Sequence, residues 1–325
     1  MTSFMHTIAR ATSLRRLGLP LALATLTACA EDARAPHVPT APSAGPGFAR
    51  GGNGDNNGRI VFMSNRDDPA AFEIYSMNRD GTGVTRLTRS AGDDIDPALS
   101  PDGKRIVFTT TRDDERGEIY VMNADGTGVT RLTYSPGFDL SPVWSKDGKQ
   151  IAFESSRDAV DPFDPNGIDV YVMNADGTQV TRITDGPGYD GRPSWSADGK
   201  QIAFESDRAI ATTRDVYVVS VGDRRVTRVT YLDMFDGVHP SWSPGGKQIT
   251  FANYDVFVVN ADGTQLTQLT TGAPNSSPSW MDGGKKIVFT NFLENAEIYS
   301  MNADGTGVTR LTYNPLIDTY PSGDR

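Results

Sequence analysis

Short apolar runs separated by Asp-Gly turns recur along the chain from Arg59 onward. Each repeat closes with a tetrad of the form Thr-x-x-Thr, and successive tetrads begin on average about 45 residues apart. A repeat of this length is typical of a propeller blade with four strands. The pattern therefore predicts an all-β protein, a six-bladed β-propeller. The six tetrads begin at Thr85, Thr130, Thr181, Thr227, Thr267 and Thr309.

Each repeat divides into four short segments separated by turn signals. The first segment is Pro-x-Trp-Ser, as at Pro142, and the Asp-Gly turn after it is typical of a hairpin. The second and third segments are apolar at successive positions, as in Ile151-Ala-Phe and Val170-Tyr-Val-Met. Such strands need cover on both faces of their sheet, which neighbouring blades supply. The fourth strand does not alternate cleanly, so we expect a bulge or a twist there.

Tryptophan recurs at a single position of the first strand. Because the position is repeated, we predict that these side chains lie in the core between blades and do not form a platform for sugar rings. The four residues are Trp144, Trp195, Trp242 and Trp280.

The two ends of the repeat region complement each other. The first repeat begins directly at its second strand, Arg59-Ile-Val-Phe, and lacks a first strand. The chain ends with residues 318–325, which match the start of a first strand and nothing after it. We therefore predict that the C-terminal segment supplies the inner strand of blade 1, so that residues 59–325 form one closed ring without exposed edges.

The residues before the ring have the features of an export signal and a tether. Residues 17–28 are uncharged and follow three arginines, and they are too few to cross a membrane as a helix. Leu26-Thr27-Ala28-Cys29 resembles the lipobox of bacterial lipoproteins, which predicts cleavage before Cys29 and its lipidation. The alternative is a plain secretory signal with an incidental cysteine. Residues 29–58 are rich in Ala, Pro, Gly and Asn, so we expect a disordered tether.

Charge and composition exclude several classes of function. The chain carries 31 basic and 41 acidic side chains, a formal charge of −10, which argues against nucleic acid as a partner. A single cysteine excludes a disulfide framework and a cysteine-rich zinc site. Three histidines, of which only His239 falls in the repeats, leave little room for a histidine-ligated metal.

The repeated phrases Pro-x-Trp-Ser-x-Asp-Gly-Lys and Tyr-x-Met-Asn-Ala-Asp-Gly-Thr resemble the C-terminal propeller of the TolB family, whose repeats are WD-repeat-like. The resemblance covers residues 59–325. TolB carries an α/β domain before its propeller, where this chain has a short tether and a predicted lipid anchor. The resemblance implies a periplasm-facing propeller of the cell envelope that binds an envelope protein or peptide on one face. We expect a monomer that contacts the membrane only through its lipid.

Five acidic residues and one asparagine precede the prolines of the first strands by three positions, with a one-residue shift before Pro240. If they lie near the axis, their mutual repulsion would favour a bound cation or a basic segment of a partner. We therefore predict binding at the channel mouth, with calcium as the candidate metal at Asp94, Asp139, Asp190 and Asp318. The local alternative is that each acid makes a turn that starts the strand. The six positions are Asp94, Asp139, Asp190, Asp236, Asn275 and Asp318.

Arginines follow the second strand in four repeats, at the same predicted rim. We expect Arg66, Arg112, Arg157 and Arg208 to pair with neighbouring acids and to hold the loops, in preference to contacting a ligand. The loop from Arg157 to Gly167 is long and contains Phe163, so it is our candidate for partner selection, with a solvated insertion as the alternative.

The sequence favours a binding module over an enzyme. Propeller peptidases need a hydrolase domain with a Gly-x-Ser-x-Gly motif, which is absent here. Propeller polysaccharide lyases use several histidines around a metal, and the repeats offer only His239. We therefore predict no catalytic residues and no certain cofactor, with a polysaccharide lyase or another metal-assisted enzyme as the alternative function.

Overall fold

The computed structural model describes residues 58–210, 212–232 and 238–324. The chain divides into two units, residues 1–56 and 57–325, and the second contains every described strand. The predicted signal, Cys29 and the predicted tether up to residue 57 lie outside the described residues.

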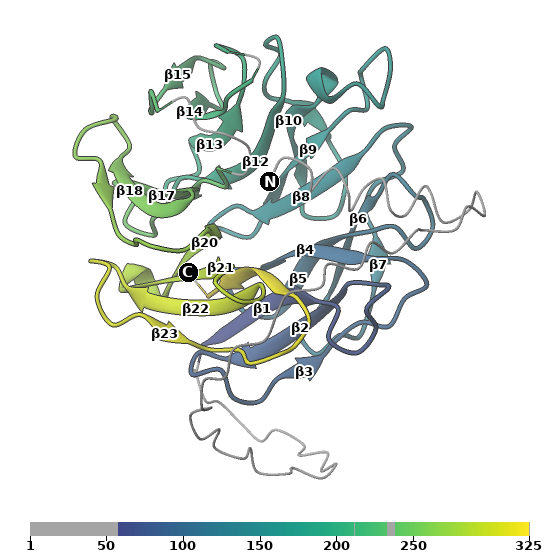
Figure 1. Ribbon diagram of the computed structural model, residues 1–325. Coiled ribbons are helices and arrows are strands. Elements are labelled where there is room, and N and C mark those ends of the chain that lie inside the picture. The colour runs from purple at the N-terminus through teal and green to yellow at the C-terminus, as the bar shows by residue number, and fades with distance from the viewer. Residues whose placement is uncertain (1–57, 211, 233–237, 325) are drawn as a thin grey trace, which may run out of the picture. The chain divides into compact units, whose positions relative to one another are not determined.

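Six antiparallel sheets of four strands surround a common centre, which confirms the predicted six-bladed propeller (Figure 1). In each blade the strands follow one another outward from the centre. The first three blades are β24 (Asp318–Gly323), β1 (Arg59–Ser64), β2 (Glu73–Asn78) and β3 (Thr85–Arg86); β4 (Asp94–Leu99), β5 (Arg105–Thr110), β6 (Glu118–Asn123) and β7 (Thr130–Arg131); and β8 (Asp139–Trp144), β9 (Gln150–Ser155), β10 (Asp169–Asn174) and β11 (Thr181–Arg182).

The other three blades repeat the pattern, and two single-turn 3-10 helices, η2 (Pro165–Gly167) and η3 (Asp282–Gly284), lie in loops. These blades are β12 (Asp190–Trp195), β13 (Gln201–Ser206), β14 (Asp215–Ser220) and β15 (Val226–Arg228); β16 (Ser241–Trp242), β17 (Gln248–Asn253), β18 (Asp255–Asn260) and β19 (Thr267–Gln268); and β20 (Asn275–Met281), β21 (Lys286–Asn291), β22 (Glu297–Asn302) and β23 (Thr309–Arg310).

The core lies between the blades, as the continuous apolar strands require. Phe108 and Phe153 on second strands, like their counterparts in the other blades, are fully buried. The four tryptophans are also buried, which confirms that they belong to the core. Trp144, for example, packs in one cluster with Ala98 and Val107 of the preceding blade. Each sheet therefore buries both of its faces against its neighbours.

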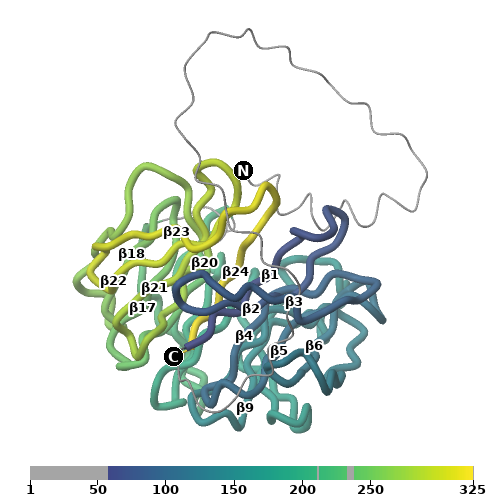
Figure 2. The backbone as a smooth tube through the Cα atoms, turned by 90° about the horizontal axis from the view of Figure 1, so that it is seen from below, coloured from purple at the N-terminus to yellow at the C-terminus, as the bar shows by residue number. Residues whose placement is uncertain are grey.

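The C-terminal strand closes the ring. Figure 2 shows β24, in yellow, beside β1, in purple. The two strands pair antiparallel, with Ser64 opposite Asp318 and Ile60 opposite Gly323. The predicted closure is thus confirmed, and it removes the free edge that β1 would otherwise present.

In five blades a register shift lies in the first strand, whereas we expected a bulge or a twist in the fourth. Between Ile95 and Ala98 the pairing of β4 with β5 skips two residues, and β8, β12, β20 and β24 show the same irregularity. The fourth strands are short, and most pair over only two residues. Apolar and polar residues do not alternate in the fourth strands because these strands are so short. The bulge belongs to the first strand, which lines the axis.

The antiparallel strands give the propeller two distinct faces. We call the side formed by the connections from fourth to next first strand, and from second to third strand, the loop face. The opposite side, formed by the turns from first to second strand and from third to fourth strand, is the hairpin face.

Replacing Asp318 with alanine is expected to lower the free energy of unfolding by about 3–5 kcal/mol, because Arg66 would lose a fully buried partner across the closure. Chemical denaturation followed by tryptophan fluorescence measures the change. The control is Glu294→Ala, which removes an exposed partner of Arg310 and should cost about 1 kcal/mol or less. Equal losses in the two variants would contradict this role for Asp318.

Candidate functional site

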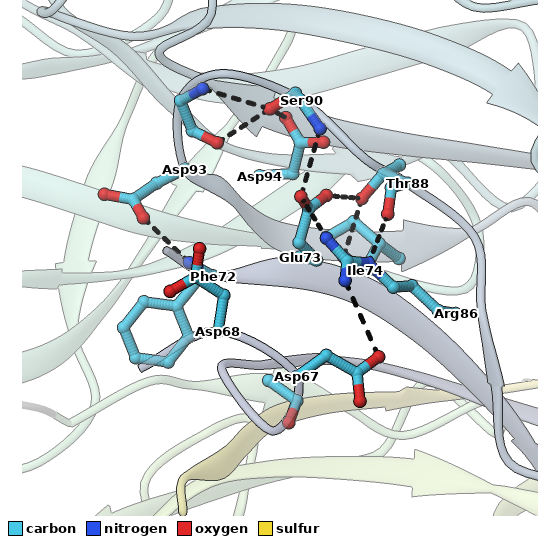
Figure 3. Close-up of polar contacts among 12 residues, drawn as sticks. Asp67, Asp68, Phe72, Glu73, Ile74, Arg86, Thr88, Ser90, Asp93 and Asp94 are labelled. Atoms are coloured by element: carbon cyan, nitrogen blue, oxygen red, sulfur yellow. Dashed lines mark hydrogen bonds and ion pairs between the residues drawn. The ribbon is translucent and has the colours of Figure 1, made fainter. Parts of the chain in front are cut away.

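A polar seam joins neighbouring blades below the loop face, and Figure 3 shows the seam between blades 1 and 2. Glu73, at the start of β2, accepts hydrogen bonds from Arg86 at 2.7 Å and from the Thr88 hydroxyl at 2.6 Å. The Ser90 N–H donates to the same carboxylate at 3.0 Å, and the Ser90 hydroxyl lies 3.2 Å from Asp94 of the next blade. One short connection therefore links two buried acids from two blades.

The acid at the start of the first strand, which we call the inner acid, is paired with the arginine that follows the second strand. Asp94, Asp139, Asp190 and Asp318 are all fully buried. The guanidinium nitrogen lies 2.6 Å from the carboxylate in Arg66–Asp318, 2.9 Å in Arg112–Asp94 and 2.7 Å in Arg157–Asp139, and Arg208 pairs with Asp190 in the same way.

Each of these arginines also stacks on aromatic rings of its own blade. The Arg157 guanidinium lies 5.0 Å from the ring centre of Phe153 and 5.2 Å from that of Tyr171, which adds a cation–π attraction. Burial raises the pKa of Asp139 above its usual range, although Arg157 and Ser155 lower it. The four rim arginines are thus engaged inside the blades, where they hold the loops.

The inner acids do not line the cavity along the propeller axis. Asn275 takes the same place in blade 6, where its amide bonds the Ala273 carbonyl and accepts from Asn291. Asp236 lies outside the described residues. Within residues 58–210, 212–232 and 238–324, no group of three His, Cys, Asp or Glu side chains is arranged to hold a metal ion. The calcium hypothesis therefore gains no support from this geometry.

A different ring of residues surrounds the axis, and sequence reasoning missed it. These are the residues immediately before the first-strand prolines, and each has a left-handed backbone with φ between 45° and 53°. Non-glycine residues rarely adopt this conformation, and it occurs here at each first-strand bulge. All six line the axial cavity. The axial ring consists of Asp96, Ser141, Arg192, His239, Ser277 and Tyr320.

Arg192 of blade 4 spans the axis. Its guanidinium pairs with Asp96 of blade 2 at 3.0 Å and donates to the Tyr320 hydroxyl of blade 1 at 3.3 Å. The His239 ring nitrogen lies 3.2 Å from the same hydroxyl, and the Ser141 hydroxyl donates to Asp96 at 3.3 Å. Burial lowers the pKa of Arg192, but Asp96, Tyr320 and Glu154 more than compensate, so its pKa stays well above the usual value.

Two buried glutamates accept hydrogen bonds from the backbone of the axial ring. Glu154 accepts the backbone N–H of Arg192 at 2.8 Å, and Glu205 accepts that of His239 at 2.9 Å. Glu154 also accepts the Tyr189 hydroxyl at 2.6 Å, and Glu205 pairs with Arg214 at 2.8 Å. A signal for this network existed in the sequence, because Glu stands at this second-strand position only in blades 3 and 4.

The loop face carries the most exposed apolar side chains of the described residues. Phe163, in the long loop of blade 3, is 68% exposed and packs edge-on against Phe138. Three tyrosines that follow the fourth strands of blades 2, 4 and 6 are 72–76% exposed. Nine large apolar residues share this face: Tyr134, Val160, Phe163, Ile210, Tyr231, Leu232, Tyr254, Leu293 and Tyr313.

Comparisons with known proteins agree with this architecture. Residues 164–291 match the family described as the TolB beta propeller domain, and residues 56–168 match the Tricorn protease N-terminal beta propeller domain. The crystal structure of TolB from Acinetobacter baumannii superposes with a TM-score of 0.72 at 25% identity, over 83% of this chain and 67% of that one. The ring is therefore similar to the TolB β-propeller in fold, and residues 164–291 are similar to it in sequence.

The similarity to TolB proteins in sequence is partial. A protein TolB homolog from Chlorobium luteolum is 35% identical over 149 residues, which are 46% of this chain and 31% of that protein. The matched region thus spans about a third of the curated relative. An oligogalacturonate lyase solved in complex with manganese shares the fold, with a TM-score of 0.52 and 15% identity, over 78% of this chain and 72% of that one. No described helix has the length and hydropathy that a membrane crossing requires.

Asp169, which begins β10 as Glu73 begins β2, is expected to give the stability of the protein an unusual dependence on pH. Burial raises the pKa of Asp169 from 3.8 to about 6, although Arg182 lowers it. The folded protein therefore binds the proton of the Asp169 carboxyl group more tightly than the unfolded chain does. The resulting stabilisation of the fold is present below pH 3.8 and is lost as the pH rises through 6. Relative to Asp169→Asn, the wild type should lose about 1–3 kcal/mol of unfolding free energy between pH 4 and pH 7.

Denaturation curves at several pH values measure this difference. The control is Asp176→Asn, because Thr178 lowers the pKa of Asp176 and the dependence should have the opposite sign. A difference between wild type and Asp169→Asn that stays constant or grows with pH would refute the assignment.

Proposed function

We propose that this TolB-like propeller is a non-enzymatic scaffold of the cell envelope and binds a partner protein or peptide through its loop face. The observation that carries the proposal is the gathering of strongly exposed apolar side chains on this one face. Single exposed apolar residues are ordinary, but a concentration on one face marks an interaction surface. The five other exposed large apolar residues of the described chain are repeat equivalents on the hairpin face, 37–53% exposed.

The exposed tyrosines are preorganised for contact. Tyr134, Tyr231 and Tyr313 each lie under the arginine of their own fourth strand, with the guanidinium 4.3–4.6 Å from the ring centre. A ring held in place loses little conformational freedom when it is covered, and tyrosine is enriched at the energetic centres of interfaces. Loops of unequal length on a rigid ring supply the rest of the specificity, with Phe163 in the longest of them.

The partner's central contact is the axial ring, in place of the acidic mouth expected at the inner acids. The inner acids are buried and paired, so a basic segment of a partner would have to displace their arginines. Asp96 and Tyr320, in contrast, are partly exposed. Most interfaces have an apolar core inside a polar rim. The loop face would offer a partner the reverse arrangement, a polar centre inside a ring of apolar loops.

The envelope assignment rests on the predicted export signal of residues 1–28 together with the likeness to TolB proteins. In this proposal Cys29 carries the lipid, the chain is a monomer facing the periplasm, and residues 29–58 set the distance of the ring from the membrane. The lyase function comes second, because the likeness to the oligogalacturonate lyase extends only to the fold.

Site-specific photocrosslinking in intact cells tests the partner face. With p-benzoylphenylalanine in place of Tyr134 or Tyr231, irradiation should give one or a few defined protein adducts. The same probe in place of Val129 or Val308, exposed on the hairpin face, is the matched control and should give none. Equal adducts from both faces, or none from the loop face, would contradict the proposal. Release of unsaturated fragments from polygalacturonate by the purified protein would favour the lyase.

A further inference from the structure

The loop face and the hairpin face differ in charge as well as in apolar exposure. In the described connections that form the loop face, nine acidic side chains are exposed and only one basic side chain, Arg89. The described connections of the hairpin face expose nine acidic and eight basic side chains. Opposite charges therefore nearly cancel on the hairpin face, whereas the exposed charge of the loop face is strongly negative.

The loop face stays negative because most of its arginines neutralise buried acids. The four rim arginines pair with the inner acids, and Arg214 pairs with the buried Glu205. Only two of the nine exposed acids, Asp67 and Glu294, have a fourth-strand arginine within 4 Å in the described part of the chain, at 3.6 and 3.4 Å. The field of such a face attracts cationic groups and repels phosphates.

Five of the nine exposed acids lie in three segments of blades 2 and 3, residues 111–117, 132–138 and 156–168. All three segments are described, and none of them exposes a basic side chain. We call this surface the blade 2–3 patch. Three of the exposed apolar residues of the loop face belong to it: Tyr134, Val160 and Phe163. Its exposed acids are Asp113, Glu115, Asp158, Asp161 and Asp164.

Contacts between the three segments make the blade 2–3 patch one continuous surface. Arg116 donates to the Pro136 carbonyl, which joins the first segment to the second. The Phe138 N–H donates to the Ser156 hydroxyl at 2.9 Å, and the Phe138 ring lies 5.6 Å from that of Phe163, which joins the second segment to the third. Apolar rings and carboxylates are therefore presented together.

The carboxylates on either side of Phe163 are held in place. Asp161 accepts the N–H of Phe163 and Asp164 accepts that of Asn166, each at 2.9 Å. Both side chains remain exposed, so they can also accept from a cation. No three acids of the described chain are arranged to hold one metal ion. Spaced carboxylates around an apolar ring instead suit the separate cationic groups of a polypeptide.

We propose that the blade 2–3 patch binds a basic segment of the partner polypeptide, in which lysine or arginine side chains flank an apolar side chain. This inference rests on the proposed function of the loop face. The apolar side chain packs beside Phe163, and the basic side chains approach Asp161 and Asp164. The apolar contact supplies affinity, and the complementary charge selects the partner and speeds its encounter.

Fluorescence anisotropy with the full chain tests the chemistry of the partner. The probe is a short labelled peptide of lysine, leucine and glycine. A second peptide has glutamate in place of lysine, and a third has serine in place of leucine. The first peptide should bind most tightly, and its affinity should fall with added salt because exposed charges are screened. Equal affinity for the first peptide and either of the others, or no binding of the first, overturns the proposal.

Matched variants locate the site. Asp161→Asn with Asp164→Asn removes two charges but keeps an oxygen that can accept the backbone N–H of the loop. This pair should weaken binding of the lysine–leucine peptide about three- to tenfold. The control is Asp125→Asn with Asp176→Asn, which removes two charges from similar turns on the hairpin face and should leave the affinity unchanged. Equal weakening by both pairs would mean that only the net charge matters, and it would overturn the proposal.

The crosslinks at Tyr134 separate this proposal from the proposed function. With p-benzoylphenylalanine in place of Tyr134, the Asp161→Asn and Asp164→Asn pair should lower the yield of the adduct in cells, whereas the hairpin-face pair should not. Adducts that are insensitive to the loop-face pair would overturn the basic partner and leave the scaffold function standing. Absence of adducts without either pair would contradict the scaffold function itself.

Discussion

The ring depends on one repeated interaction, the ion pair between the inner acid of a blade and the arginine after its second strand. The acid lies at the start of the strand that follows the preceding blade, so in blades 1–4 the pair fixes where the blade begins. In blade 1 the same pair, Arg66–Asp318, joins residues 252 positions apart and ties the two ends of the ring. A fully buried carboxylate is costly without a charged partner, and the arginine that supplies the charge is itself held by two aromatic rings.

These ion pairs also decide which side chains a ligand can contact. Four blades share the buried inner acid and its arginine, and four share the tryptophan, so many arginines are engaged inside the seams. The positions that differ from blade to blade are the axial ring and the loops. Asp96, Arg192 and Tyr320 occupy equivalent places with different side chains, which is possible because the left-handed residue at the bulge lines the axial cavity and lies outside the repeated seam. The proposed specificity for a partner would therefore reside at the axis and on the loop face.

The fold could be predicted from the sequence because its determinants are local and periodic: apolar strands, hairpin turns and a missing first strand in the first repeat. The site could be predicted only in part. The inner acids were correctly grouped as equivalent, and their pairing with Arg112 and its counterparts was expected. The direction in which these acids point was not predicted, because strand alternation does not reveal that two residues bulge out of the first strand. That bulge buries Asp94 in the seam and brings Asp96, two residues later, to the axis.

The axis then has two ends with different chemistry, separated by Arg192. On the loop face, apolar side chains surround a polar centre, and toward the hairpin face the wall of the cavity is formed by the first-strand prolines. Arg192 contacts the inner strands of blades 1 and 2 from blade 4, so its guanidinium links three blades across the axis. Two ligands influence each other only when their contacts favour different states of a shared element. Arg192, held to Asp96 and Tyr320, is the element that both ends share, and coupling between the faces would require its rearrangement.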